Sequence, residues 1–300
     1  MHAFKQEAAP AMVDPDVALW SEQLLRDGYI IVRGAIERET IEAIDADFAA
    51  PFAETPFSQG FFFGARTIRF GRALIRSPHA ATLVQHRLVR GIAEHVLGPW
   101  CDGVQLNLTQ AIAVHPGAPA QLPHRDEDMW PGPKGQFEYM INVIWPFSRF
   151  TVETGATRIW RGSHREDRAT FIGDDRCISA EMEPGDAVVW LGSTLHGQGE
   201  NSSDEIRRGL AIGYSLSWLK QYENQYLAYP PEVAKTFNRD LAELIGYRQL
   251  PPNLNNFEAR SPMTLLEDAT SDTMGAVDAL ADYQEVASRY YAEHGHTRAR

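Results

Sequence analysis

Apolar and polar positions divide the chain into three parts. Before residue 100 the apolar side chains recur at the three- to four-residue spacing of amphipathic helices, interrupted by one short extended run at 29–34. From 104 to 218 the pattern changes to short runs of β-branched and aromatic residues separated by Gly, Pro, Asp and Ser turns. Helical spacing returns after residue 218. The pattern predicts a mainly β protein with flanking helices.

The same spacing gives approximate bounds for each element. Helices are expected near 17–27, 37–48, 88–97, 232–246 and 275–293, and strands near 29–34, 104–115, 138–146, 156–160, 177–181, 186–191 and 206–217. This density of short strands is typical of a double-sheet jelly roll, the cupin-like double-stranded β-helix. With 300 residues, 44% of them hydrophobic, we predict a single domain over 1–300. Within it we expect a loose N-terminal arm at 1–13, a jelly-roll core at 104–218, and a C-terminal helical lid or dimer element at 219–300.

Two histidines and one aspartate provide candidate chemistry in the β region. His124 and Asp126 are two positions apart, so alternation along an extended strand points both side chains to one side. His196 follows the buried run 186–191 and is expected on a separate strand. Two imidazoles and one carboxylate can hold non-haem Fe(II) on one face and leave the opposite coordination positions open. Each residue alone could equally be an ordinary hydrogen-bonded residue of a β fold.

A polar turn follows His196, and the next strand carries Arg207 eleven residues further on. A hairpin of this length brings Arg207 back alongside the candidate metal. Its planar guanidinium can bind a carboxylate through two hydrogen bonds. Alternation places its neighbour Arg208 on the opposite face of the strand.

The ordered set of motifs resembles the phytanoyl-CoA dioxygenase family of Fe(II)/2-oxoglutarate-dependent oxygenases. It comprises His-x-Asp, a distal His in a Leu-His-Gly-x-Gly-x-Asn context, and the later Arg. The motifs Asp27-Gly28-Tyr29, Glu153-Thr154-Gly155-Ala156-Thr157 and Arg161-Gly162-Ser163-His164 extend the resemblance to about Trp218. Arg161 stands where the family usually has proline. The form His124-Arg125-Asp126-Glu127-Asp128 is most similar to members that act on polycyclic natural products.

The resemblance implies a role for each candidate residue. His124, Asp126 and His196 would bind Fe(II), and Arg207 would pair with the distal carboxylate of the cosubstrate 2-oxoglutarate. Gln121 and Thr157 match positions that hydrogen-bond 2-oxoglutarate, although both could be ordinary polar residues of strands. Relatives often place a further cosubstrate contact near a basic cluster such as Arg66, Arg69 and Arg72. The sequence does not select one of the three, and a solvated face is the alternative.

The implied reaction is hydroxylation, desaturation or rearrangement at an unactivated C–H bond, with O₂ consumed and succinate and CO₂ released. Halogenation is disfavoured because family halogenases replace the aspartate ligand with a small residue. A small hydrophobic natural product is the expected substrate. Aromatic residues near the motifs are its candidate contacts, with burial in the core as the alternative: Phe62, Phe63, Trp130, Tyr139 and Trp218.

Two other functions are open to the same residues. A zinc-dependent hydrolase could use the same ligand set, but it would leave Arg207 and Gln121 without a role. A non-catalytic binding protein on this scaffold would not need the complete ligand set.

Charge and segment length restrict the partners. There are 40 acidic and 28 basic residues, giving a net charge of −12, and no long run of Lys or Arg. A nucleic-acid partner is therefore not expected. No stretch approaches the ~20 apolar residues of a membrane span, and the N-terminus lacks the features of a signal peptide. We predict a cytoplasmic enzyme with small-molecule partners, and the C-terminal helices are candidates for a homodimer interface.

Overall fold

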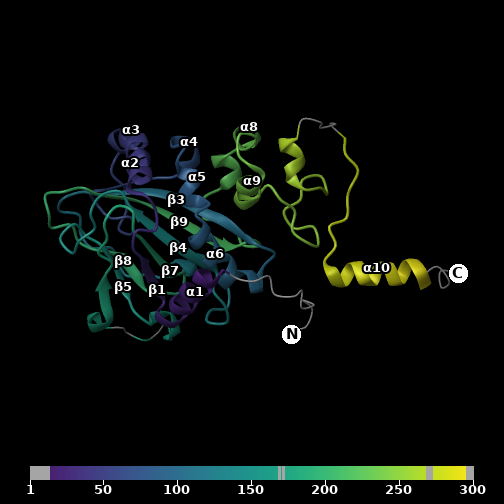
Figure 1. The fold of residues 1–300 in the computed structure, drawn as a ribbon, viewed down its shortest axis with the longest axis horizontal. Coiled ribbons are helices and arrows are strands. Elements are labelled where there is room, and N and C mark those ends of the chain that lie inside the picture. The colour runs from purple at the N-terminus through teal and green to yellow at the C-terminus, as the bar shows by residue number, and fades with distance from the viewer. Residues whose placement is uncertain (1–13, 168–169, 171–172, 268–272, 295–300) are drawn as a thin grey trace.

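The computed structural model describes residues 14–167, 170, 173–267 and 273–294 (Figure 1). Its strands form two sheets. The larger sheet is antiparallel, with the order β1-β7-β4-β9-β3-β2, and the smaller has the order β6-β5-β8. The strands are β1 (Tyr29–Val32), β2 (Thr67–Phe70), β3 (Val104–Val114), β4 (Met140–Pro146), β5 (Thr157–Trp160), β6 (Cys177–Ser179), β7 (Ala187–Leu191), β8 (His196–Gln198) and β9 (Arg207–Leu216). The predicted jelly-roll-like architecture is confirmed.

Alternation along the central strands separates two apolar layers. In β7, Ala187, Val189 and Leu191 join the main core, whereas Val188 and Trp190 join a second cluster with residues of β5. β4 divides in the same way: Ile141, Val143 and Trp145 face the main core, and Ile144 faces the second cluster. The large sheet is therefore covered by helices on one face and by the small sheet on the other.

Helices α1 and α6 form part of the main core. The α helices are α1 (Pro15–Asp27), α2 (Arg38–Asp47), α3 (Ala49–Glu54), α4 (Ala73–Arg76), α5 (Ala80–Val84), α6 (Arg87–Leu97), α7 (Gln225–Ala228), α8 (Pro231–Ala234), α9 (Arg239–Ile245) and α10 (Asp282–His294). α1 packs on α6 and β1, and α6 contacts β3, β4 and β9. The three amphipathic patterns before residue 100 thus correspond to α1, α2 and α6, whereas the short helices α3, α4 and α5 were not predicted.

Gly28 ends α1, as the sequence predicts. Its φ is +85°, and its N–H donates to the Leu24 carbonyl at 2.8 Å. A Cβ at this position would lie 2.6 Å from Nδ1 of His164 and 2.8 Å from Oγ1 of Thr194. Glycine is thus required both for the left-handed conformation and for the close packing of α1 on the loops next to β8.

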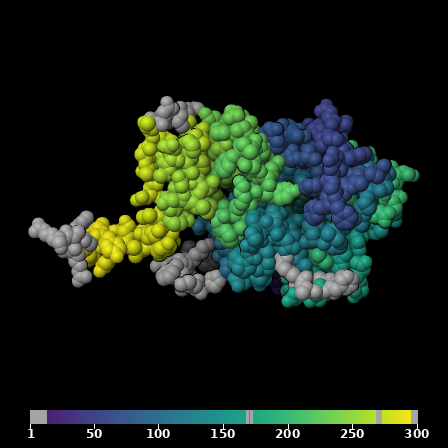
Figure 2. All heavy atoms as spheres, turned by 180° about the vertical axis from the view of Figure 1, so that it is seen from behind, coloured from purple at the N-terminus to yellow at the C-terminus, as the bar shows by residue number. Residues whose placement is uncertain are grey.

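The C-terminal part differs in detail from the prediction. The pattern at 232–246 forms two short helices, α8 and α9, because the Asn238 side chain accepts a hydrogen bond from the Leu241 N–H and begins a new helix. α9 packs on β3. The final helix, α10, has no buried residue and projects beyond the rest of the molecule (Figures 1 and 2).

Two further expectations concern the N-terminal arm and membrane-spanning segments. The predicted N-terminal arm at 1–13 lies outside the described residues. Among the described residues, no helix is both long and apolar enough to cross a membrane.

Candidate metal centre and cosubstrate pocket

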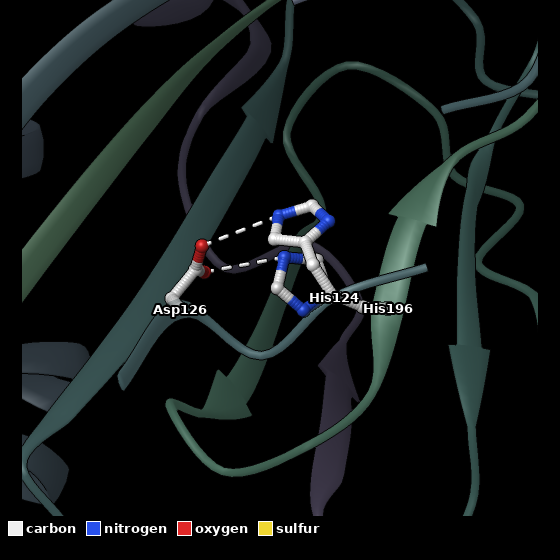
Figure 3. A group of neighbouring side chains, drawn as sticks. All are labelled: His124, Asp126 and His196. Atoms are coloured by element: carbon white, nitrogen blue, oxygen red, sulfur yellow. Dashed lines mark ion pairs between the residues drawn. The ribbon is translucent and has the colours of Figure 1, made fainter. Parts of the chain in front are cut away.

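The two histidines and the aspartate come together in the structure (Figure 3). Potential ligand atoms of His124, Asp126 and His196 all lie within 4.8 Å of one another. His196 begins β8, as expected for a separate strand. His124 and Asp126 are not on a regular strand: His124 makes one antiparallel β-bridge to His196, and Asp126 begins the 3₁₀ turn η2 (Asp126–Met129). Because the intervening Arg125 is extended, both side chains still point to one side.

Backbone contacts orient both imidazole rings. Nδ1 of His124 lies 2.9 Å from the Leu122 carbonyl, and Nδ1 of His196 lies 3.1 Å from the Thr194 carbonyl. Carbonyl oxygens only accept, so each Nδ1 carries a proton, and Nε2 is the nitrogen through which a neutral ring could bind a metal. The Nε2 atoms lie 3.4 and 3.2 Å from the Asp126 carboxylate oxygens. This arrangement fits a metal ion, because metal-bound histidines commonly donate their other ring N–H to a carbonyl.

Asp126 is held as a carboxylate. Burial alone would raise its pKa, but the charges and hydrogen bonds of His196 and His124 outweigh burial and hold the pKa well below its ordinary value. Nδ2 of Asn142, on β4, also donates to Oδ2 of Asp126 at 2.7 Å. Asn142 was not predicted, although a single polar residue within the apolar strand 140–146 was a usable signal. A buried amide in such a strand needs a polar partner.

Arg207 lies in the same pocket as the three candidate ligands, as the strand spacing predicts. The pocket has a volume of about 360 Å³. The Arg207 side chain is buried, with the residue 3% exposed, and its guanidinium carbon lies 4.4 Å from the centroid of the Phe150 ring. Among the described residues, Nε and Nη1 of Arg207 have no hydrogen-bond acceptor. Burial, assisted by the nearby charge of Arg69, lowers the Arg207 pKa to about 9.

Of the three candidate arginines 66, 69 and 72, the structure brings only Arg69 into the pocket. Its guanidinium donates to Oε1 of Gln110 at 3.0 Å and to Oε1 of Gln198 at 3.4 Å. Burial lowers its pKa to about 10. Arg66 instead donates to the Pro116 carbonyl at 2.6 Å, and Arg72 is exposed. The selection could not be predicted because β2, which carries Arg69, was not recognised.

The remaining predicted site residues separate into two groups. Gln121, Thr157, Phe62 and Phe63 line the pocket. Gln121 also donates to the Phe62 carbonyl at 3.0 Å, and the Phe62 ring lies edge-on to His124 with 4.7 Å between centroids.

The other three aromatic residues do not line the pocket. Trp130 and Tyr139 are buried, and their polar atoms donate to the carbonyls of Lys220 and Pro133. Trp218 is 43% exposed and donates to the Trp100 carbonyl. These three belong to one cluster of aromatic rings, so packing is the better interpretation of all three. Met129, which adjoins Trp130 and belongs to the same predicted segment, does line the pocket; Tyr222 also lines it and was not predicted as a contact.

Comparison with known proteins identifies the family. Residues 24–209, more than half of the chain, match the family described as phytanoyl-CoA dioxygenase (PhyH). The chain belongs to the phytanoyl-CoA dioxygenase family. It is 31% identical to the dioxygenase aneA of Aspergillus aculeatus over 75% of this chain and 80% of that protein. It is 28% identical to the multifunctional dioxygenase prhA of Penicillium brasilianum over 80% of this chain and 84% of that protein. The predicted family and dioxygenase class are confirmed.

Solved structures show the same fold at lower sequence identity. The epimerase SnoN from nogalamycin biosynthesis, a non-haem α-ketoglutarate-dependent enzyme, has a TM-score of 0.57 at 20% identity, over 68% of this chain and 84% of that chain. HygX from Streptomyces hygroscopicus, solved with nickel and 2-oxoglutarate, has a TM-score of 0.53 at 13% identity, over 67% of this chain and 88% of that chain. At these identities the likeness supports the jelly-roll fold.

Proposed function

We propose that this member of the phytanoyl-CoA dioxygenase family uses Fe(II) and 2-oxoglutarate to oxidise an unactivated C–H bond of a small hydrophobic molecule. The observation that carries the proposal is the buried Arg207, whose Nε and Nη1 find no acceptor in the described part of the chain and which shares a pocket with His124, Asp126 and His196. A buried cation without a partner is costly, and an anionic ligand would compensate it. A zinc hydrolase would have no use for this anion site.

Each residue then has a defined task. Nε2 of His124, Nε2 of His196 and an Asp126 oxygen would hold Fe(II), with Asn142 steadying the carboxylate. When bound, Fe(II) would activate O₂, the oxidant, whose reduction is shared between the substrate C–H bond and the decarboxylation of 2-oxoglutarate to succinate and CO₂. Arg207 would bind the distal carboxylate of the cosubstrate. Gln121 and Thr157 line the same pocket and are proposed as additional hydrogen-bonding groups for the cosubstrate.

Apolar side chains form much of the pocket wall. Its side chains include Phe62, Phe63, Met129, Ile144 and Trp190. Phe62 and Met129 are partly exposed, which suits residues at a pocket mouth. A mostly apolar wall with few polar groups is typical of sites for small hydrophobic ligands. Similar folds occur in an enzyme of nogalamycin biosynthesis and in HygX with hygromycin B bound, which supports a natural-product substrate.

The cosubstrate site can be tested without the substrate. Fe(II) and 2-oxoglutarate are added anaerobically to metal-free protein, and the visible metal-to-ligand charge-transfer band of the chelated cosubstrate is titrated. We expect the band in the wild type and a loss of 2-oxoglutarate affinity on the order of 100-fold in Arg207→Ala. Arg208→Ala is the matched control, because Arg208 points to the opposite face and pairs with Asp45 at 2.6 Å. Absence of the band together with tight Zn²⁺ binding would favour the hydrolase instead.

The substrate class requires a separate experiment. Succinate formation is measured with panels of apolar polycyclic compounds and of CoA thioesters. We expect stimulation by apolar compounds, and we expect Phe62→Ala to lower this stimulation about tenfold while 2-oxoglutarate affinity is unchanged. Leu227→Ala provides a control, because Leu227 is also an exposed apolar residue but does not line the pocket. Stimulation by CoA thioesters alone would overturn the proposed substrate class.

A further inference from the structure

The candidate metal ligands come from two segments that are distant in sequence. Residues 124–126 supply one histidine and the aspartate, and residues 193–196 lead to the other histidine. The main chains of the two segments are paired by a single β-bridge, in which the two histidines exchange N–H···O bonds of 2.9 and 3.0 Å. On either side of the bridge one further backbone bond joins the flanking residues: the Gln121 N–H donates to the Gln198 carbonyl at 2.9 Å, and the Glu127 N–H donates to the Gly192 carbonyl at 3.1 Å. Because this backbone pairing is sparse, the position of one segment relative to the other also depends on side-chain contacts.

Arg125, between His124 and Asp126, makes two such contacts. Its Nε donates to the Ser193 carbonyl at 2.9 Å, and its Nη2 donates to the Ser163 carbonyl at 3.2 Å. Both serines are buried. The guanidinium thus connects the segment that bears the first two ligands to two separate loops.

Both of those loops fix the residues just before His196. Ser193 lies three residues before His196 in the turn that enters β8. Oγ of Ser163 accepts a hydrogen bond at 2.8 Å from the N–H of Leu195, the residue immediately before His196. Ser193 is itself held by Glu138, which accepts from its hydroxyl at 2.6 Å. The Arg125 contacts therefore end on groups that fix the backbone leading into the third ligand.

We infer that Arg125 is a positioning residue that sets the placement of His196 relative to His124 and Asp126. The inference rests on the proposed function, because it takes these three residues as the metal ligands. Residues that orient metal ligands from outside typically alter metal affinity 10- to 100-fold when mutated. An arginine suits this role because its rigid planar fork reaches two carbonyls at once, whereas a lysine ammonium is a single point donor on a flexible stem.

The test is a Co(II) titration of metal-free, full-length protein, followed by its visible spectrum. We expect Arg125→Met and Arg125→Gln to weaken Co(II) binding about 10- to 100-fold and to change the spectrum at saturating metal. Arg125→Lys should recover part of the loss. Arg33→Met is the matched control: Arg33 also donates to a backbone carbonyl, that of Glu181, at 2.8 Å and pairs with Asp186 at 2.7 Å, but these partners belong neither to a ligand segment nor to the loops at Ser163 and Ser193.

The outcomes separate the inference from the proposed function. If wild-type protein binds no Co(II) or Fe(II), the proposed function itself fails. If the wild type binds but the Met and Gln variants keep its affinity and spectrum, the positioning role is wrong. A lower melting temperature with an unchanged spectrum at saturating Co(II) would show only a structural role and would also overturn the inference. The Gln variant, which can still donate one hydrogen bond, keeps the test usable if the Met variant does not fold.

Discussion

At the scale of single residues, Arg207 and Arg208 show how one strand assigns opposite environments to identical side chains. They are adjacent at the start of β9 and point to opposite faces. Arg208 is half-buried and pairs with Asp45. Arg207 is buried among pocket residues, and burial lowers its pKa to about 9. Burial of the Arg207 cation thus costs free energy, whereas the charge of Arg208 is compensated by its salt bridge to Asp45.

The contrast predicts opposite effects on stability. Arg207→Met should raise the free energy of unfolding of the ligand-free protein by about 1 kcal/mol or more, because an uncompensated buried charge is replaced by an apolar side chain. Arg208→Met should lower it, because Asp45 loses its partner. Thermal melts measure both effects. With metal present in both samples, adding 2-oxoglutarate should stabilise the wild type but not Arg207→Met, because a ligand that binds only the folded state stabilises it. A destabilised Arg207→Met protein would contradict this account.

Residue-scale prediction from sequence succeeded where chemistry and local spacing decide the outcome. His124 and Asp126 converge because alternation needs only one extended residue between them. Trp130 and Tyr139 show the limit: an aromatic side chain next to a motif can pack inward or line a pocket, and the sequence pattern is the same for both. Only the three-dimensional packing shows that their polar atoms are paired with backbone carbonyls outside the pocket.

At the scale of elements, the register between β4 and β9 places Gly213 opposite Asn142. A Cβ at Gly213 would lie 2.8 Å from Oδ1 of Asn142 and 3.2 Å from Cε of Met140. Asn142 in turn donates to Asp126. Because Gly213 has no side chain, the Asn142 amide has room to reach the Asp126 carboxylate.

Gly213→Ala should therefore weaken metal binding through Asn142. We expect a loss of Co(II) affinity of about tenfold, because the displaced amide no longer steadies the carboxylate. Asn142→Ala should show a similar loss, and the double variant should be no worse than either single variant, since both act on one hydrogen bond. Titrations of the four proteins measure this coupling. Additive losses would mean that Gly213 matters for another reason.

Element-scale prediction was accurate for the long strands and for the short strands β1, β5, β6 and β7, but it missed β2. β3, β4 and β9 lie close to their predicted bounds because many alternating residues contribute to each pattern. β2 has only four residues and was missed. Its Ile68 and Phe70 face the main core, so Arg69 between them must face the other side, toward the pocket. Recognising this one short strand would have selected Arg69 from the three candidate arginines.

At the scale of the whole molecule, the fold class was predictable because the change in apolar spacing at residues 104 and 218 marks the sheet-rich region. The role of the C-terminal part was not. Among the described residues after Trp218, Tyr222 alone lines the pocket, so a lid remains a prediction without a supporting contact. α10 is an exposed helix of 13 residues with no buried side chain. A helix of about this length is only marginally stable alone in water.

The exposed helix supports the prediction of a homodimer. Tyr283, Val286 and Tyr290 share one face of α10 at helical spacing, and each is more than half exposed. Burial of this stripe against a second copy would supply the packing that the isolated helix lacks. We expect the full-length protein to have twice its 33.6 kDa mass in light scattering, and a chain ending at residue 274 to be a monomer. Val286→Asp should also give monomers, whereas Ser288→Asp, on the opposite face, should not. A full-length monomer, or a dimer that persists after truncation, would place any interface elsewhere.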